Sequence, residues 1–175
     1  MSFDSRFLLL PAAAIVMIQP AVAGELQSMQ DAQQRLVRGA KLTPFEFRLS
    51  PEQHAQIKEA YQVPSIRPLV RGWRTDQGAT LFLDQVYGRD DVVTYLVLVG
   101  DDGKVRGLEV LTCAEGYCEV FTTEWRARLT GVTHGRWKPE DVVPIVSGST
   151  LSTVHIAEGV KKVLAIHARY MPQPG

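Results

Sequence analysis

The amino-acid sequence predicts one α+β domain, an antiparallel sheet covered by helices, with a long C-terminal helix after residues 147–150 (SGST). Three observations predict it. The chain has 175 residues and is 45% hydrophobic, enough for a single core. Apolar segments between residues 80 and 122 are separated by turns too short for helical crossovers, which favours antiparallel pairing. An apolar stripe at helical spacing follows residue 150.

The N-terminal segment is typical of a secretory signal peptide. Residues 7–18 form an apolar run after Arg6, and the small residues Ala21, Val22 and Ala23 follow it as a cleavage pattern. Spanning a bilayer takes about 20 apolar residues, so an uncleaved anchor is the minority alternative. We therefore expect residues 1–23 to be removed, and residues 24–175 to form the mature domain in the periplasm.

Two helices are expected next. The pattern over Leu26–Val37 predicts a helix that stops near Gly39. Residues 50–53 (SPEQ) combine an N-cap serine, a proline at the first helical position and a glutamine at the third, which is a capping box. The second helix should continue to about Tyr61, because Pro64 and Pro68 follow it.

Four strands are expected after these helices, and the second of them is apolar at nearly every position. Such a strand is typically covered on both faces of the sheet. The predicted strands are Thr80–Tyr87, Val92–Val99, Lys104–Thr112 and Tyr117–Thr122.

A short helix and a long helix complete the expected order. The short one covers Thr123–Leu129 and ends at Gly131. The long one begins near Ser152 and ends before Pro172. Its apolar stripe consists of Ile156, Val160, Val163, Leu164 and His167, whereas Glu158, Lys161, Lys162 and Arg169 lie outside the stripe.

Charge and composition exclude several classes of protein. The 19 basic residues equal the 19 acidic ones, which leaves no electrostatic footprint for nucleic acid, and the mixed composition excludes low-complexity disorder. His54, His134 and His167 have no carboxylate or thiol at ligand spacing, so we expect no metal site.

Cys113 and Cys118 are the only cysteines. In an oxidising compartment they are expected to form a local disulfide, and the alternative is two packed or free thiols. Neither lies in a C-x-x-C pair, which argues against a thioredoxin-type redox centre.

Hydroxyl side chains gather just before the long helix, where residues 147–153 read SGSTLST. A helix N-terminus presents unpaired N–H groups and a partial positive charge, and a glycine and hydroxyls there favour a bound phosphate. Serine and threonine are also the preferred N-cap residues, so a simple cap is the alternative.

Residues 147–152 resemble the S-G-A-T-x-S/T segment of the FMN-binding domain family, which includes the periplasmic flavin domains of the Rnf complex G subunit and the sodium-pumping quinone reductase C subunit. The resemblance covers roughly Ala79–Tyr170 and includes residues 103–111 (GKVRGLEVL), the acidic, Gly- and Tyr-containing turn at 115–117, and Trp125–Gly131. The chain differs from many members at Ser149, where they have alanine, and at Pro144, where they have aspartate.

The resemblance implies that residues 24–175 form an FMN-binding domain. It implies that a flavin transferase moves FMN from FAD onto the Thr150 hydroxyl as a phosphodiester, and that the protein carries electrons between a membrane donor and a periplasmic partner. We expect a monomer. The further candidate cofactor-binding residues are Ser147, Gly148, Ser149, Leu151, Ser152, Thr153, Glu115, Tyr117 and His155, with Trp125 as a candidate wall residue or a core residue.

Two other classes of function stay open. A non-redox periplasmic module with the same fold could hold a phosphorylated ligand, or nothing, at the same cap. A small serine hydrolase based on Ser149 and His155 is disfavoured, because the segment does not complete G-x-S-x-G. A flavin carries the redox chemistry itself, so no catalytic residue is assigned.

Overall fold

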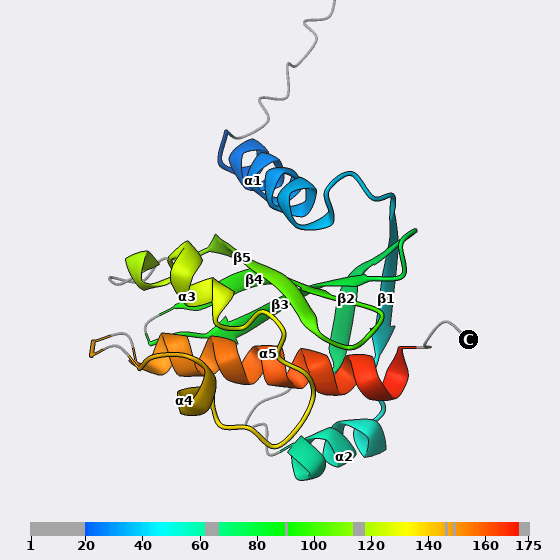
Figure 1. Cartoon of the computed structure of the whole chain (residues 1–175). Coiled ribbons are helices and arrows are strands. Elements are labelled where there is room, and N and C mark those ends of the chain that lie inside the picture. Colours follow the sequence, from blue (N-terminus) through cyan, green and yellow to red (C-terminus); the bar gives the residue numbers. More distant parts are fainter. Residues whose placement is uncertain are drawn as a thin grey trace, which may run out of the picture.

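Five strands form one antiparallel sheet in the order β1-β2-β3-β4-β5, with helices on both faces (Figure 1). The structure is a computed structural model that describes residues 20–61, 67–89, 91–113, 118–145, 147–148 and 150–171. The prediction of an α+β domain with an antiparallel sheet and a long C-terminal helix is confirmed. The signal-peptide prediction falls largely on residues 1–19, outside this range.

The strands are β1 (Leu42–Arg48), β2 (Leu69–Thr75), β3 (Thr80–Tyr87), β4 (Val92–Val99) and β5 (Val105–Thr112). The helices are α1 (Pro20–Val37), α2 (Pro51–Tyr61), α3 (Thr123–Ala127), α4 (Pro139–Val142) and α5 (Thr150–Tyr170), with a 3-10 turn η1 at Cys118–Val120. Within the described part of the chain, no helix has the length and apolar character needed to span a membrane.

Strand β4, which lies between β3 and the edge strand β5, is apolar because it contributes to two cores. Tyr95 and Val97 face the main core beneath α5, whereas the alternate residues Leu96 and Leu98 face a smaller core beneath α1. All four side chains are buried. The prediction that this strand is covered on both faces is therefore confirmed.

Several predicted ends are confirmed by hydrogen bonds. In the capping box of α2, the Gln53 N–H donates to Ser50 Oγ (3.2 Å) and the Ser50 N–H donates to Gln53 Oε1 (2.8 Å). The Thr122 hydroxyl caps α3 by accepting from the Trp125 N–H (3.2 Å). Strands β3 and β4 have the predicted bounds, and β5 begins one residue later than predicted.

The predicted strand Tyr117–Thr122 is wrong. Residues 118–120 form η1, and Thr122 is already the N-cap of α3. The Phe121 and Trp125 rings pack edge to face, 5.3 Å apart, within the main core. This packing turns the chain into α3 and leaves β5 as an edge of the sheet.

Two strands, helix α4 and the first six residues of α1 were absent from the prediction. The edge strand β1 contains Pro44, and β2 carries arginines and Gly72 instead of a continuous apolar run. Helix α1 begins at Pro20 rather than at Leu26, and α4 is a single turn of four residues. Local apolar patterning is weak in all of these elements.

Lys161 and Lys162 were predicted to lie outside the apolar stripe of α5, on its exposed side. This prediction is wrong, because the two side chains are buried, with only 7% and 3% of their surface exposed. The Lys161 ammonium donates to the Trp137 carbonyl (2.8 Å) and lies 5.7 Å from the Trp137 ring centroid. Lys162 forms an ion pair with Asp84 (Nζ to Oδ2, 2.6 Å). Partners from distant segments make this burial possible.

Candidate functional site

Three segments meet at the end of the sheet where α5 begins (Figure 1). Tyr87 and Val92 are paired next to the β3–β4 turn, and the pairing of Thr94 with Thr112 brings the end of β5 to the same side. The Arg89 N–H donates to Ser152 Oγ (3.3 Å), and His155 Nδ1 lies 2.6 Å from the Tyr87 carbonyl oxygen. These two contacts hold the first turn of α5 against the β3–β4 turn.

The approach to α5 is a short exposed turn. Ser147 and Gly148 are exposed, and Gly148 has a φ of +91°, in the left-handed region that favours glycine. Thr150 is half-buried as the first residue of the helix. Exposed residues therefore lie on both sides of the helix start.

Two of the candidate hydroxyl groups are buried within the first turn. The Thr153 hydroxyl donates to the Thr150 carbonyl (3.0 Å), and Ser152 accepts from the backbone of Arg89. Both side chains are at most 2% exposed. Their contacts fix the helix start, and a ligand role for either one stays a prediction.

Large apolar side chains remain exposed at this end of the molecule. Among the described residues, the exposed large hydrophobic side chains are Tyr87 (68%), Ile145 (52%) and Leu151 (50%). Tyr87 ends β3, Ile145 precedes the turn into α5, and Leu151 lies in its first turn. Of these three residues, only Leu151 was named as a candidate site residue from the sequence. The position of Ile145, between Pro144 and the turn at Gly148, was a usable signal for an exposed apolar residue.

His155 is oriented by the strand it contacts. A carbonyl oxygen only accepts, so Nδ1 carries the proton in the contact with Tyr87, and Nε2 is the acceptor of the neutral ring. One turn further along, burial raises the pKa of the Glu158 carboxyl, an effect opposed by the charges of His155 and Lys161. The helix thus carries two titratable groups near its start.

Other candidate residues fall outside this cluster or outside the described residues. Glu115, Tyr117 and Ser149 lie outside the described residues, so their predicted roles stay predictions. Trp125 is 4% exposed and lies in the main core. In the parts that the structure describes, no group of three His, Cys, Asp or Glu side chains could hold a metal ion.

Cys113 and Cys118 form a disulfide with a Cα–Cα distance of 5.9 Å. Cys113 follows the last residue of β5, and Cys118 begins η1. The bond links the end of β5 to the start of η1. It therefore shapes the third segment at the end of the sheet where α5 begins.

A buried polar cluster, which the sequence analysis missed, fixes α5 on the sheet. The Tyr95 hydroxyl donates to Asp84, which also accepts from the Lys162 ammonium (Nζ to Oδ1, 2.7 Å). Burial, followed by the negative charge of Asp84, raises the pKa of Tyr95 well above its usual value. Gly159 faces this cluster, where a Cβ would lie 2.2 Å from Tyr95 Oη. The helix can approach the strands this closely only without a side chain at residue 159.

No protein-family model matches the chain, and no curated protein matches it. The functional proposal below therefore depends on the residues at the start of α5 and on the sequence resemblance stated above.

Proposed function

We propose that this protein is an exported flavoprotein that binds FMN at the N-terminus of α5, covalently through Thr150, and carries electrons in the periplasm. One observation carries the proposal. A turn built from Ser147 and Gly148 opens onto the N-terminus of a 21-residue helix, and exposed apolar side chains flank that turn.

The helix start suits the phosphate of FMN. The first N–H groups of a helix lack partners within the helix, and the helix dipole adds a partial positive charge there. The left-handed Gly148 lets the backbone turn without a side chain in the way. A phosphate ester on Thr150 would lie at the first residue of the helix, where both effects favour negative charge.

The surroundings suit the ring system of a flavin. Ile145 and Leu151 flank the turn in sequence, and Tyr87 lies on the strand that contacts His155, so their exposed side chains offer apolar surface for a flat aromatic group. His155 holds Nδ1 against a backbone carbonyl, which leaves Nε2 to accept or, once protonated, to donate a hydrogen bond. When bound, the flavin supplies reversible electron transfer, so the chain needs no catalytic dyad.

Attachment is a group transfer that a separate flavin transferase would catalyse. The Thr150 hydroxyl oxygen forms a bond to the FMN phosphorus of FAD, the bond from that phosphorus to AMP breaks, and the hydroxyl proton is given up as AMP leaves. The net products are the phosphodiester and AMP. The chain's own contribution is to present Thr150 at a helix N-terminus beside an exposed turn.

The test is flavin fluorescence of the exported protein after denaturing electrophoresis, with and without co-expression of a flavin transferase. The wild-type band should fluoresce only with the transferase. Thr150→Ala should lose the band, whereas Thr43→Ala, which removes an exposed hydroxyl from β1 outside the proposed site, should keep it. Thr150→Ser should keep part of it.

A fluorescent Thr150→Ala band would overturn the assignment of the attachment site. Yellow native protein that loses all flavin on denaturation would indicate FMN bound without a covalent bond. Colourless protein in every case would overturn the flavoprotein proposal and favour a non-redox module of the same fold.

A further inference from the structure

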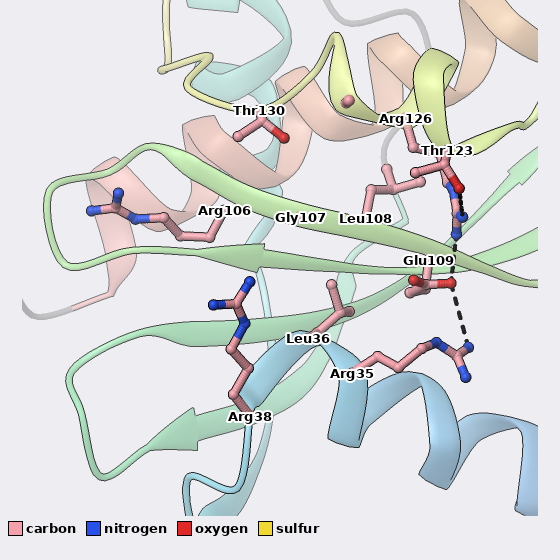
Figure 2. A pocket seen from close by; sticks show the side chains of 11 residues that line it. Arg35, Leu36, Arg38, Arg106, Gly107, Leu108, Glu109, Thr123, Arg126 and Thr130 are labelled. Atoms are coloured by element: carbon pink, nitrogen blue, oxygen red, sulfur yellow. Dashed lines mark hydrogen bonds and ion pairs between the residues drawn. The ribbon is translucent and has the colours of Figure 1, made fainter.

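A cavity lies between α1, β5 and α3 (Figure 2). Its volume is about 550 Å³, within the range of small-molecule sites. Helix α1 covers the sheet face opposite α5, whereas α3 packs in the main core, so the cavity lies along β5, at the edge of the sheet (Figure 1).

The charge of this cavity is strongly biased although the chain as a whole is neutral. Arg35, Arg38, Arg106 and Arg126 line it against a single carboxylate, Glu109. Three elements that are distant in sequence supply these guanidinium groups. Their convergence on one cavity creates a local positive potential.

The four arginines lie in two pairs, one at each end of the cavity. Glu109 contacts both Arg126 (Nη1 to Oε2, 2.5 Å) and Arg35 (3.4 Å), so this end keeps one net positive charge. The Nε of Arg126 is buried with no hydrogen-bond partner among the described residues. At the other end lie Arg38 and Arg106, as Figure 2 shows. Arg106 pairs with Asp102 (3.0 Å), and Arg38 has no acidic partner in the described part of the chain.

Between the two ends the cavity is bordered by Leu36, Gly107 and Leu108. Its apolar surface comes from Leu36, because Leu108 is only 4% exposed and packs in the main core. A Cβ at Gly107 would lie 2.8 Å from Leu36 Cδ2, so glycine lets α1 approach the strand here. An apolar strip with a guanidinium pair at each end is complementary to a short carbon chain with an acidic group at each end.

We propose that this cavity binds a small organic anion with two acidic groups, one near Arg38 and Arg106 and the other near Arg35 and Arg126. A guanidinium binds a carboxylate or a phosphate through two parallel hydrogen bonds, so both acidic groups share the required chemistry. Glu109 holds Arg35 and Arg126 together when no anion is bound. The proposal does not depend on flavin binding.

The test is isothermal titration calorimetry of the mature chain, prepared without flavin, with succinate, glutarate, inorganic pyrophosphate and inorganic phosphate as probes. At least one of the three probes with two acidic groups should bind saturably with one site per chain, and more tightly than inorganic phosphate. Its affinity should fall at higher salt, because exposed charges are screened. A dicarboxylate or pyrophosphate preference identifies the acidic group.

Arg38→Gln and Arg106→Gln should each weaken binding about tenfold or more, because each removes charge-assisted hydrogen bonds to the ligand. Both side chains are exposed, so the variants should fold. Arg128→Gln, an equal loss of charge at the end of α3 but outside the cavity, should change affinity less than twofold. The proposal is overturned by no saturable binding of any probe, by equal affinity for phosphate, or by an equal loss in Arg128→Gln.

Discussion

The close contact between α5 and the sheet predicts that Gly159→Ala destabilises the protein. Alanine is normally the better helix former, by about 1 kcal/mol. Here the new Cβ would lie 2.2 Å from Tyr95 Oη and 2.8 Å from Val86 Cγ1. Tyr95 is fully buried in β4 and hydrogen-bonded to Asp84, so it has little room to move.

The expected loss of stability depends on which contacts the new methyl group disrupts. Overpacking a core costs about 1–3 kcal/mol, and breaking a hydrogen bond to a charged group costs about 1.5–3 kcal/mol. After subtracting the gain in helix propensity, we expect Gly159→Ala to lower the free energy of unfolding by about 1.5–5 kcal/mol. In Gly159→Ala/Tyr95→Phe the clashing hydroxyl is absent, so the double variant should lose less than the sum of the single variants.

Urea denaturation followed by far-ultraviolet circular dichroism measures these differences. Ala168→Gly, on the exposed side of α5, is the control for helix propensity and should cost about 1 kcal/mol. The account of the contact is refuted if Gly159→Ala is as stable as the wild type, or if the double variant shows simple additivity.

Three further predictions concern stability. Asp84→Asn leaves the Lys162 ammonium buried without its counter-charge and should cost about 3–5 kcal/mol in urea denaturation, whereas a loss below about 1 kcal/mol would contradict the buried ion pair. Burial, followed by the positive charges of Arg74 and His134, lowers the pKa of His167. As the pH falls, the unfolded chain therefore protonates this histidine before the folded chain does. Stability should therefore fall as the pH drops below about 6.5, and His167→Leu should flatten that slope; equal slopes in the two proteins would contradict this assignment. Replacing Cys113 and Cys118 together by serine should lower the free energy of unfolding by about 2 kcal/mol, because the closed loop is short, and an unchanged urea midpoint would count against this contribution.

The central strands could be predicted from sequence because their signal is local. Strand β4 is apolar at almost every position, and β3 has the predicted bounds. Strands β1 and β2 could not, since Pro44 and Gly72 interrupt their patterns and the sheet supplies their order through pairing. A residue's place in an edge strand depends on partners that are distant in sequence.

The same contrast between local signals and contacts of distant residues applies to the candidate sites. The SGST turn and the helix after it are consecutive residues, so the sequence could indicate them. The burial of Lys162 depends on Asp84, which is 78 residues away, and that of Lys161 on Trp137, which is 24 residues away. Helical periodicity describes one element only, and it places both lysines outside the stripe.

The arginine-lined cavity had no sequence signal for a related reason. Arg38 follows α1 and Arg106 lies in β5, and the four strands β1 to β4 and helix α2 separate them in the chain. The pairing of β4 with β5 and the packing of α1 on β5 bring them to one cavity. Only the assembled fold shows that their charges converge.

The most direct test of the proposed flavin site is the intact mass of the mature protein after export, co-expression with a flavin transferase and denaturation. The proposal predicts an added mass of about 438 Da, one FMN less one water, on the peptide that contains Thr150. The unmodified mass in the wild type, or the same added mass in Thr150→Ala, would contradict covalent attachment at Thr150.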